Sequence, residues 1–257
     1  MNMKKNMRRI LAFAAMAMGM MGTVAVVGAC SSGMANSSVS INSTVDFSQS
    51  DLVQKSFTKI EVETVADVYY TQNNGSKESV RFDFSQIKDA KLRQQYQEKA
   101  VAIYRDGKVI IGLKKNISGS QKLSKGSRLR VYITSPDLVK VTVEGVGYFH
   151  SDAINSDTFT IDNEGVGNID IKNLLANQIT VDNEGVGSVT VANLKGDFLD
   201  IDNEGVGSVK AHVDCQSIQA VLEGVGSIHL SGVTRQLTKQ KEGVGSFDIS
   251  DLKVLGK

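Results

Sequence analysis

The second half of the chain repeats one pattern of apolar and polar positions. In each copy an apolar-x-apolar segment precedes Glu-Gly-Val-Gly and another follows it, and the glycine after the glutamate recurs at spacings of 20, 20, 20, 19 and 19 residues. These glycines are Gly145, Gly165, Gly185, Gly205, Gly224 and Gly243. Period-2 alternation rich in β-branched residues predicts strands with one buried face, whereas the i, i+3, i+4 spacing of a helix is absent. The repeat therefore predicts an all-β solenoid with coils of about 20 residues.

Stacking places equivalent residues of successive coils in columns about 4.8 Å apart, which buries apolar faces that no single repeat could bury. Between the two flanks of each copy, Gly-x-Gly supplies a corner, because glycine tolerates close backbone approach. The last copy carries Lys239 and Lys241 at inward positions, as expected of a cap. We expect four inward columns: Val139, Phe159, Ile179, Leu199, Ile218 and Leu237; Val146, Val166, Val186, Val206, Val225 and Val244; Phe149, Ile169, Val189, Val209, Ile228 and Phe247; and Val141, Ile161, Val181, Ile201, Ala220 and Lys239.

An irregular strand region precedes the regular repeats, which span residues 139–250. Apolar alternation separated by turn residues such as Asp106-Gly107 predicts strands at 57–62, 68–70, 80–84, 101–104, 109–113 and 129–133. The polar stretch 85–99 has high helix propensity and predicts a short surface helix. We expect residues 56–254 to fold as one solenoid domain.

The N-terminal segment predicts the cellular location of the protein. A basic start with no acid before residue 46 leads into the apolar stretch 10–27, then small residues and Cys30. Residues 1–29 are typical of a secretory signal, and the run before Cys30 resembles a bacterial lipobox, which implies a lipidated Cys30 at the mature N-terminus. The alternative is a transmembrane anchor, since about 18 apolar residues could just span a bilayer. Residues 30–55, rich in Ser and Asn, predict a flexible tether.

Composition narrows the chemistry. With Cys30 lipidated, Cys215 has no disulfide partner and is interpreted as a small buried hydrophobe. Residues 141–257 hold 8 basic and 17 acidic side chains, a net charge of −9, which argues against nucleic acid as a partner. We predict no cofactor, no metal centre and no catalytic residue.

The constant glutamates exceed what folding needs. Glu144, Glu164, Glu184, Glu204, Glu223 and Glu242 should form one outward column. Three interpretations are open: a solvated ridge that helps to satisfy backbone N–H groups, a weak Ca²⁺-binding edge built from clustered oxygens, or a contact surface for a basic partner.

Several segments, in order, resemble a known family. They are Phe57-Thr-Lys-Ile60-Glu-Val62, Ala66-Asp67-Val68, Asp106-Gly-Lys-Val-Ile-Ile111 and Val131-Tyr-Ile-Thr-Ser-Pro-Asp-Leu138, followed by the Gly-x-Gly ladder. Over roughly residues 55–250 the chain resembles the putative auto-transporter adhesin, head GIN domain family. The resemblance implies a right-handed parallel β-helix-like fold, an envelope location and an adhesin role, and it passes on no catalytic residue.

Together these features predict a non-catalytic lipoprotein, anchored in the outer membrane at Cys30, that binds a protein or glycan. The alternative is a glycan-binding or polysaccharide-processing β-helix protein, although the repeats have no long insertion to wall a cleft. The chain lacks Trp, and its tyrosines lie toward the N-terminal half.

Overall fold

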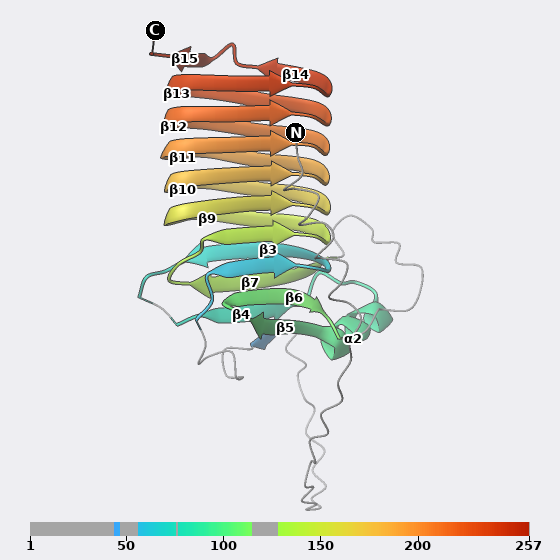
Figure 1. Cartoon of the computed structure of the whole chain (residues 1–257). Helices are drawn as coiled ribbons and strands as arrows, with labels where there is room; N and C mark the ends of the chain where they lie inside the picture. Colours follow the sequence, from blue (N-terminus) through green and yellow to red (C-terminus); the bar gives the residue numbers. More distant parts are fainter. Residues whose placement is uncertain (1–43, 47–55, 76, 115–127, 257) are drawn as a thin grey trace, which may run out of the picture. The chain divides into compact units, whose positions relative to one another are not determined.

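The computed structural model stacks the repeats as parallel coils (Figure 1) and describes residues 44–46, 56–75, 77–114 and 128–256. Each regular coil is one bent strand, interrupted only at the Glu-Gly pair. These strands are β9 (Val146–Asn163), β10 (Val166–Asn183), β11 (Val186–Asn203), β12 (Val206–Leu222) and β13 (Val225–Lys241). Each pairs in parallel with the next, so that valine faces valine and glycine faces glycine along the stack. The predicted all-β solenoid with coils of about 20 residues is confirmed.

The N-terminal strands extend the same stack, although not in sequence order. β2 (Lys59–Val62) pairs in parallel with β6 (Lys108–Leu113) and β8 (Lys140–Val143). β3 (Val65–Gln72) likewise lies between β7 (Leu129–Ser135) and β9. The layer formed by β2 and β3 therefore sits between the layer of β6 and β7 and the first regular coil, and one hydrophobic core runs through all of them.

Antiparallel strands and a helix close the lower end of this stack. β4 (Ser79–Asp83) pairs with β7, β5 (Ala100–Arg105) with β6, and β1 (Thr44–Asp46) with β4. The predicted strands are confirmed. The helix predicted at 85–99 is shorter: α2 (Ala90–Lys99) starts after Asp89, whose side chain accepts from the Leu92 amide at 2.7 Å and caps the first turn.

The C-terminal end is closed by two short strands. β14 (Val244–Asp248) and β15 (Leu252–Val254) pair with separate parts of β13. Lys239 and Lys241 are exposed on the last full coil, where the preceding coil carries the buried Ala220 and Leu222. Charged side chains at this position discourage further stacking, as the cap prediction requires.

Three of the four predicted inward columns form the core. The columns through Phe149, Phe159 and Val141 are buried in the middle of the stack, with partly buried members at the ends, such as Val139, Leu237 and Phe247. The predicted valine column is wrong. Val166 is 51% exposed and Val206 53%, so this column lies on the outer surface.

Strict alternation explains why the valines face outward. From Ile161 to Ile171 every second side chain is inward, which places Asn163, Gly165 and Gly167 inside and Glu164 and Val166 outside. A Cβ on Gly185 would lie 2.2 Å from the Gly165 carbonyl oxygen of the preceding coil, so only glycine fits. The glycines, and not the valines, are therefore the inward residues of this corner.

A column of buried asparagines, absent from the four predicted columns, also lies inside the solenoid. Asn163, Asn183 and Asn203 are fully buried. The Asn163 amide donates to Asn183 Oδ1 at 2.7 Å, and the Asn183 amide donates to Asn203 Oδ1 at 2.7 Å. Val143 and Leu222 occupy the same column in the flanking coils. These two bonds satisfy both polar atoms of Asn183 and Oδ1 of Asn203, whereas Asn163 Oδ1, at the first rung, has no hydrogen-bond partner among the described residues.

Cys30, the predicted signal and nearly all of the predicted tether lie outside the described residues. Within the described part of the chain, no helix is long and apolar enough to cross a membrane.

Candidate binding surfaces

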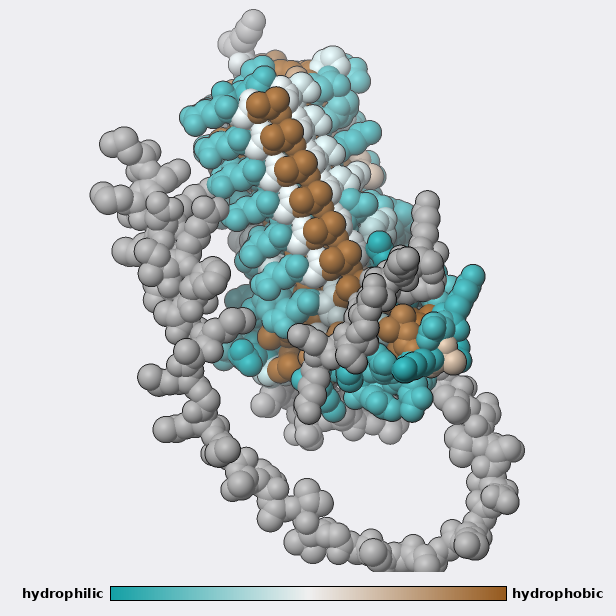
Figure 2. Space-filling model, turned by 90° about the vertical axis from the view of Figure 1, so that its right-hand side faces the viewer, coloured by the Kyte–Doolittle hydropathy of each residue, from teal (hydrophilic) through white to brown (hydrophobic). Residues whose placement is uncertain are grey.

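One edge of the solenoid combines an apolar stripe with neighbouring hydrophilic residues (Figure 2). In every copy the glutamate precedes the exposed valine by two residues, so both side chains leave the same face of the strand. The β2–β3 layer adds Glu63 and Val65, because Val65 pairs with Val146. We name this surface the valine–glutamate ridge, comprising Val65, Val146, Val166, Val186, Val206, Val225 and Val244 with Glu63, Glu144, Glu164, Glu184, Glu204, Glu223 and Glu242.

A shallow groove of about 810 Å³ follows this ridge from Glu63 to Val206. Tyr96 of α2 and Leu113 of β6 line its N-terminal end. The Tyr96 side chain is 1% exposed, and its hydroxyl has no hydrogen-bond partner among the described residues. Burial raises the pKa of this hydroxyl above its ordinary value. The groove therefore joins aliphatic, acidic and phenolic groups on one edge.

The carboxylates of the ridge repel one another. Burial, followed by the charges of Asp162, Glu144 and Glu184, raises the pKa of the Glu164 carboxyl above 4.5. Burial raises the pKa of Glu144 in the same direction, with the charge of Glu61 adding to it. Protonation is favoured first because burial disfavours the charged carboxylate. Like charges at coil spacing add an unfavourable interaction of roughly 1 kcal/mol per pair even in water. A positively charged ligand would relieve this repulsion.

The carboxylates gather most closely at the N-terminal end of the ridge. One oxygen from each of Glu61, Glu63 and Glu144 lies within 4.8 Å of the others. Lys108 forms an ion pair with Glu61 and so neutralises part of the cluster. Burial, and then the hydrogen bond that the protonated Glu63 donates to Glu61, raises the pKa of Glu63. Clustered carboxylate oxygens suit a hard cation such as Ca²⁺. Weak calcium binding at this column stays a prediction. The shift in Tm on adding calcium would test it.

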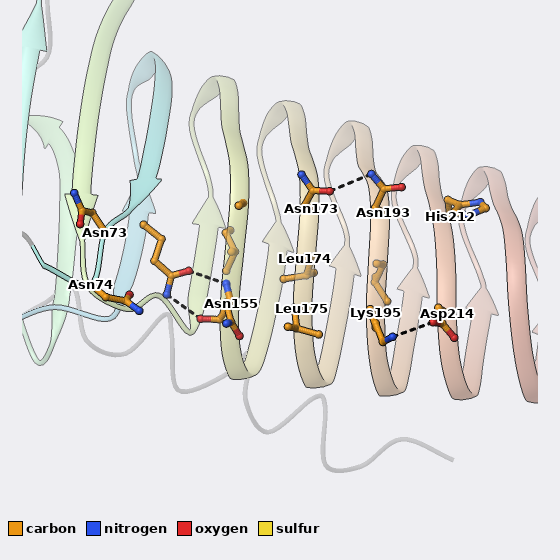
Figure 3. Close-up of a pocket in the computed structure, with 14 residues that line it drawn as sticks. Asn73, Asn74, Asn155, Asn173, Leu174, Leu175, Asn193, Lys195, His212 and Asp214 are labelled. Carbon is orange, nitrogen blue, oxygen red and sulfur yellow. Dashed lines mark hydrogen bonds and ion pairs between the residues drawn. The ribbon is translucent and has the colours of Figure 1, made fainter.

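About half a coil away from the ridge lies a second groove, of about 740 Å³ (Figure 3). We name it the amide groove, after Asn73, Asn74, Asn155, Asn173 and Asn193, which line it together with Leu174, Leu175, Lys195, His212 and Asp214.

Hydrogen bonds between coils fix the amides of this groove. The Asn193 amide donates to Asn173 Oδ1 at 3.1 Å, and the Asn173 amide donates to the Asp152 carbonyl at 3.0 Å. Gln72 pairs with the Asn155 backbone in both directions, at 2.7 and 2.8 Å. The exposed Leu175 lies among these neutral polar groups. Such a surface matches an uncharged, hydroxyl-rich ligand better than an ionic one.

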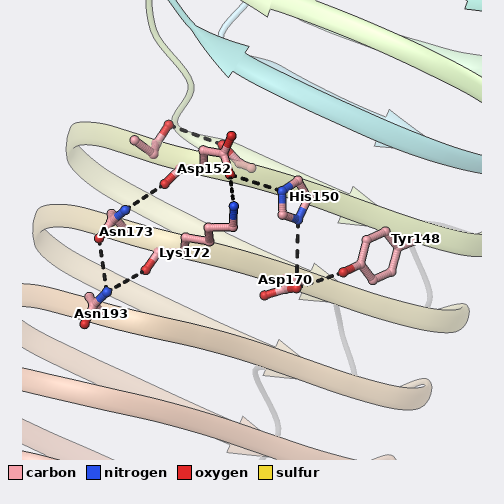
Figure 4. Close-up of polar contacts among 9 residues, drawn as sticks. Tyr148, His150, Asp152, Asp170, Lys172, Asn173 and Asn193 are labelled. Carbon is pink, nitrogen blue, oxygen red and sulfur yellow. Dashed lines mark hydrogen bonds and ion pairs between the residues drawn. The ribbon is translucent and has the colours of Figure 1, made fainter.

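A polar network occupies the outer face of the first two regular coils (Figure 4). Tyr148 donates to Asp170 at 2.8 Å, and His150 lies 3.3 Å from Asp152 and 3.8 Å from Asp170. Lys172 contacts Asp152 at 2.6 Å. Burial, and then the hydrogen bond to Asp170, raises the pKa of Tyr148 to about 12.

Aromatic rings continue this face onto the N-terminal strands. Tyr69 stacks on Tyr132 with ring centroids 5.4 Å apart, and the Arg81 guanidinium lies 4.2 Å from the Tyr132 centroid. The rings of Tyr69 and His150 also lie edge to face, with centroids 6.1 Å apart. By contrast, Tyr70 points into the core. Alternation thus divides the N-terminal tyrosines between the core and an aromatic patch on the surface.

The remaining candidate groups lie apart from one another. His150 and His229 occupy one column four coils apart. His150 contacts Asp152 and Asp170, whereas His229 contacts Asp248. Cys215 is a free, buried thiol whose pKa is raised to about 12, first by burial and then by Asp214. This confirms its interpretation as a buried hydrophobe.

Sequence reasoning missed several members of these surfaces. Glu61 and Glu63 belong to the acidic cluster because β2 stacks on β8 out of chain order. A usable signal existed, since Glu63-Thr-Val65-Ala matches the repeat with Thr and Ala at the glycine positions. The amide groove had no comparable signal, because its residues vary from coil to coil.

Stacked coils with continuous outward columns define a solenoid protein that presents extended surfaces for contact. The chain belongs to the family described as putative auto-transporter adhesin, head GIN domain, whose profile matches residues 56–192 and 187–255. This confirms the resemblance and assigns the chain to adhesin-type proteins of the cell envelope or surface.

One solved structure has a similar fold, and a second is similar at a lower score. A crystal structure described as a putative adhesin from Bacteroides fragilis is 26% identical, with a TM-score of 0.60, over 80% of this chain and 95% of that chain. A protein from Parabacteroides distasonis, described as a putative lipid binding protein, is 17% identical with a TM-score of 0.47 over 80% and 95% of the two chains. No curated protein matches the chain.

Proposed function

We propose that this protein is a non-catalytic adhesin-type lipoprotein, anchored to the outer membrane through Cys30, that uses its solenoid to bind a partner at the cell envelope. The observation that carries the proposal is the valine–glutamate ridge, a continuous surface built from the same two positions of successive coils. Family membership supports the adhesin role. The basic, apolar and small-residue segments before Cys30 support the anchor.

The chemistry of the described side chains favours binding over catalysis. The one thiol among them is buried and its pKa is high. His150 and His229 stand four coils apart, about 19 Å, so they cannot act together on one bond. Each histidine contacts aspartate at the exposed surface. The ridge instead repeats one chemistry along its length, which suits an extended ligand.

Fractionation and protease shaving test the anchor and the exposure. Wild-type protein is expected in the outer-membrane fraction, and a Cys30→Ala variant is expected to leave the membrane. Cys215→Ala is the matched control, because it removes the other cysteine and should keep the wild-type location. A Cys30→Ala protein that stays membrane-bound and uncleaved would show a transmembrane anchor instead.

Protease added to intact cells should cleave the solenoid if the protein faces outward. Full protection of the solenoid would contradict adhesion to an external partner.

Glycan binding is a second candidate function, supported by the aromatic patch and the amide groove. Tyr69, Tyr132 and Tyr148 lie on the outer face beside Arg81 and Asp170. Rings of this kind pack against sugars, while the amides of the groove can exchange hydrogen bonds with hydroxyls. A glycan array with the full chain tests this function. Binding lost in Tyr69→Ala but kept in Tyr104→Ala would support it, whereas an array with no signal would exclude the glycans it displays.

A further inference from the structure

Folding does not account for the valines of the ridge. Two residues after each valine the outward position holds Tyr148, Asn168 or a serine, and two residues later it holds polar residues such as Asp170 and Lys210. The ridge position alone is valine in all the regular copies, at 39–75% exposure. A continuous apolar stripe on a protein surface marks a contact site more often than an accident of sequence.

The charge beside the stripe restricts what can cover it. The carboxylates run parallel to the valines along the whole ridge. Two lysines at its N-terminal end contact neighbouring acids: Lys108 pairs with Glu61, and Lys140 pairs with Asp162 at 2.9 Å. The repeat half carries a net charge of −9, from 8 basic and 17 acidic residues. An anionic lipid surface is therefore repelled, and a second copy of this chain would bring a second acidic column.

We propose that the valine–glutamate ridge is the docking site for a basic amphipathic helix of a partner protein, with aliphatic side chains on the valines and Lys or Arg on the glutamates. This inference rests on the proposed binding function and names the chemistry of the partner. A helix presents an apolar stripe beside a charged one, and its 5.4 Å pitch is close to the coil spacing of about 4.8 Å. A strand would place its alternate residues on opposite faces.

The length of the ridge sets the size of the helix. Seven valines span six coil spacings, roughly 29 Å, which corresponds to about 19 helical residues. The groove runs along this edge. At the end of the groove formed by the N-terminal strands, Tyr96 and Leu113 would contact the end of the bound helix. Helices bind in this way when their apolar face lies in a groove and their flanks match its charge.

Fluorescence anisotropy with a designed helix tests the proposal. The probe is a labelled peptide of about 19 residues, with leucine at helical spacing and lysine elsewhere, titrated with the full chain in non-ionic detergent against protein-free micelles. Binding is expected to weaken as salt rises, because exposed charge pairs are screened. Two control peptides, one with glutamate for lysine and one with serine for leucine, are expected not to bind. Equal binding of the glutamate peptide would overturn the proposal.

Paired variants of the protein locate the contact. Glu184→Gln with Glu204→Gln is expected to weaken binding about tenfold and to reduce its salt dependence. Val186→Ser with Val206→Ser is expected to weaken peptide binding by a similar factor, and this factor should be the same at every salt concentration. Phe198→Ser and Asp197→Asn are matched controls, since both residues are exposed away from the ridge. Controls that weaken binding as strongly as the ridge variants would place the contact elsewhere and overturn the assignment.

The outcomes separate this inference from the proposed function. Peptide binding by a protein that shaving finds protected would support the ridge and contradict an adhesin facing outward. An exposed, anchored protein that ignores the helical peptide would keep the adhesin role and reject this partner. Sedimentation equilibrium of the same sample adds a third outcome, because a dimer lost in the valine double variant would show that a second copy covers the ridge.

Discussion

Two columns that lie three residues apart in each copy differ in burial in the opposite sense to their hydropathy. Asn163, Asn183 and Asn203 are buried, whereas Val166, Val186 and Val206 face solvent. Each asparagine finds its partner in the neighbouring coil, so burial leaves few polar groups unsatisfied. Each valine is turned outward by the glycines on either side. The difference teaches that neighbours in the stack, and not hydropathy alone, decide which residues of a solenoid are buried.

Substituting the inward glycine should break the contrast most severely. In Gly185→Ala the new methyl group would lie 2.2 Å from the Gly165 carbonyl oxygen, so the coils must separate locally. We expect a loss of about 3 kcal/mol or more in the free energy of unfolding. Val186→Ala, one residue further on, is the control and should cost little. Urea denaturation compares the two, and equal losses would show that the corner can relax.

Removing one rung of the asparagine ladder should have the next largest effect. Asn183→Ala leaves the Asn163 amide and Asn203 Oδ1 buried without their partners, which should cost about 2–4 kcal/mol. Replacing all three asparagines with leucine should cost less than the single change, because Val143 and Leu222 already fill this column in the flanking coils. Denaturant titration measures both; a triple variant less stable than Asn183→Ala would contradict this account.

The outward valines should matter little for stability. We expect Val186→Ser to change the free energy of unfolding by no more than about 0.5 kcal/mol, as at ordinary surface positions. The inward neighbour Val189→Ser is the control and should be clearly destabilising, because Val189 is fully buried. Thermal unfolding of the two variants sharpens the contrast. A large loss in Val186→Ser would give the stripe a structural role and weaken the docking proposal.

The smallest effect concerns the carboxylates and depends on pH. The pKa of Glu164 is raised above 4.5 in the folded state, so the native protein binds this proton more tightly than the unfolded chain does. Stability therefore falls as pH rises from 4.5 through the raised pKa, and the full penalty is present at neutral pH. Glu164→Gln should raise Tm at pH 7 and lose this advantage near pH 4. Asp197→Asn is the control, and a Glu164→Gln gain independent of pH would exclude the ionised, partly buried carboxylate as the cause.

Much of the fold could be predicted because each repeat carries its own signal. Alternation and the recurring glycines gave the solenoid, the strands and the glutamate column. The valine column was predicted on the wrong face because apolar character was given more weight than the alternation of inward and outward residues through the corner. A shift of one residue moves a side chain to the other face. The close cluster of Glu61, Glu63 and Glu144 depends on pairing out of chain order, which local pattern does not reveal.

The sequence by itself determined the repeat, the strand period, the outward glutamates and the family. These follow from spacing and residue type, which act locally and recur in every coil. Only the tertiary structure decided that valine forms the outer stripe, that asparagine lies inside, and that the N-terminal strands complete the ridge. Those outcomes depend on contacts between coils: a carbonyl that excludes a Cβ, an amide that reaches the next amide, and a strand inserted between layers that follow it in the chain.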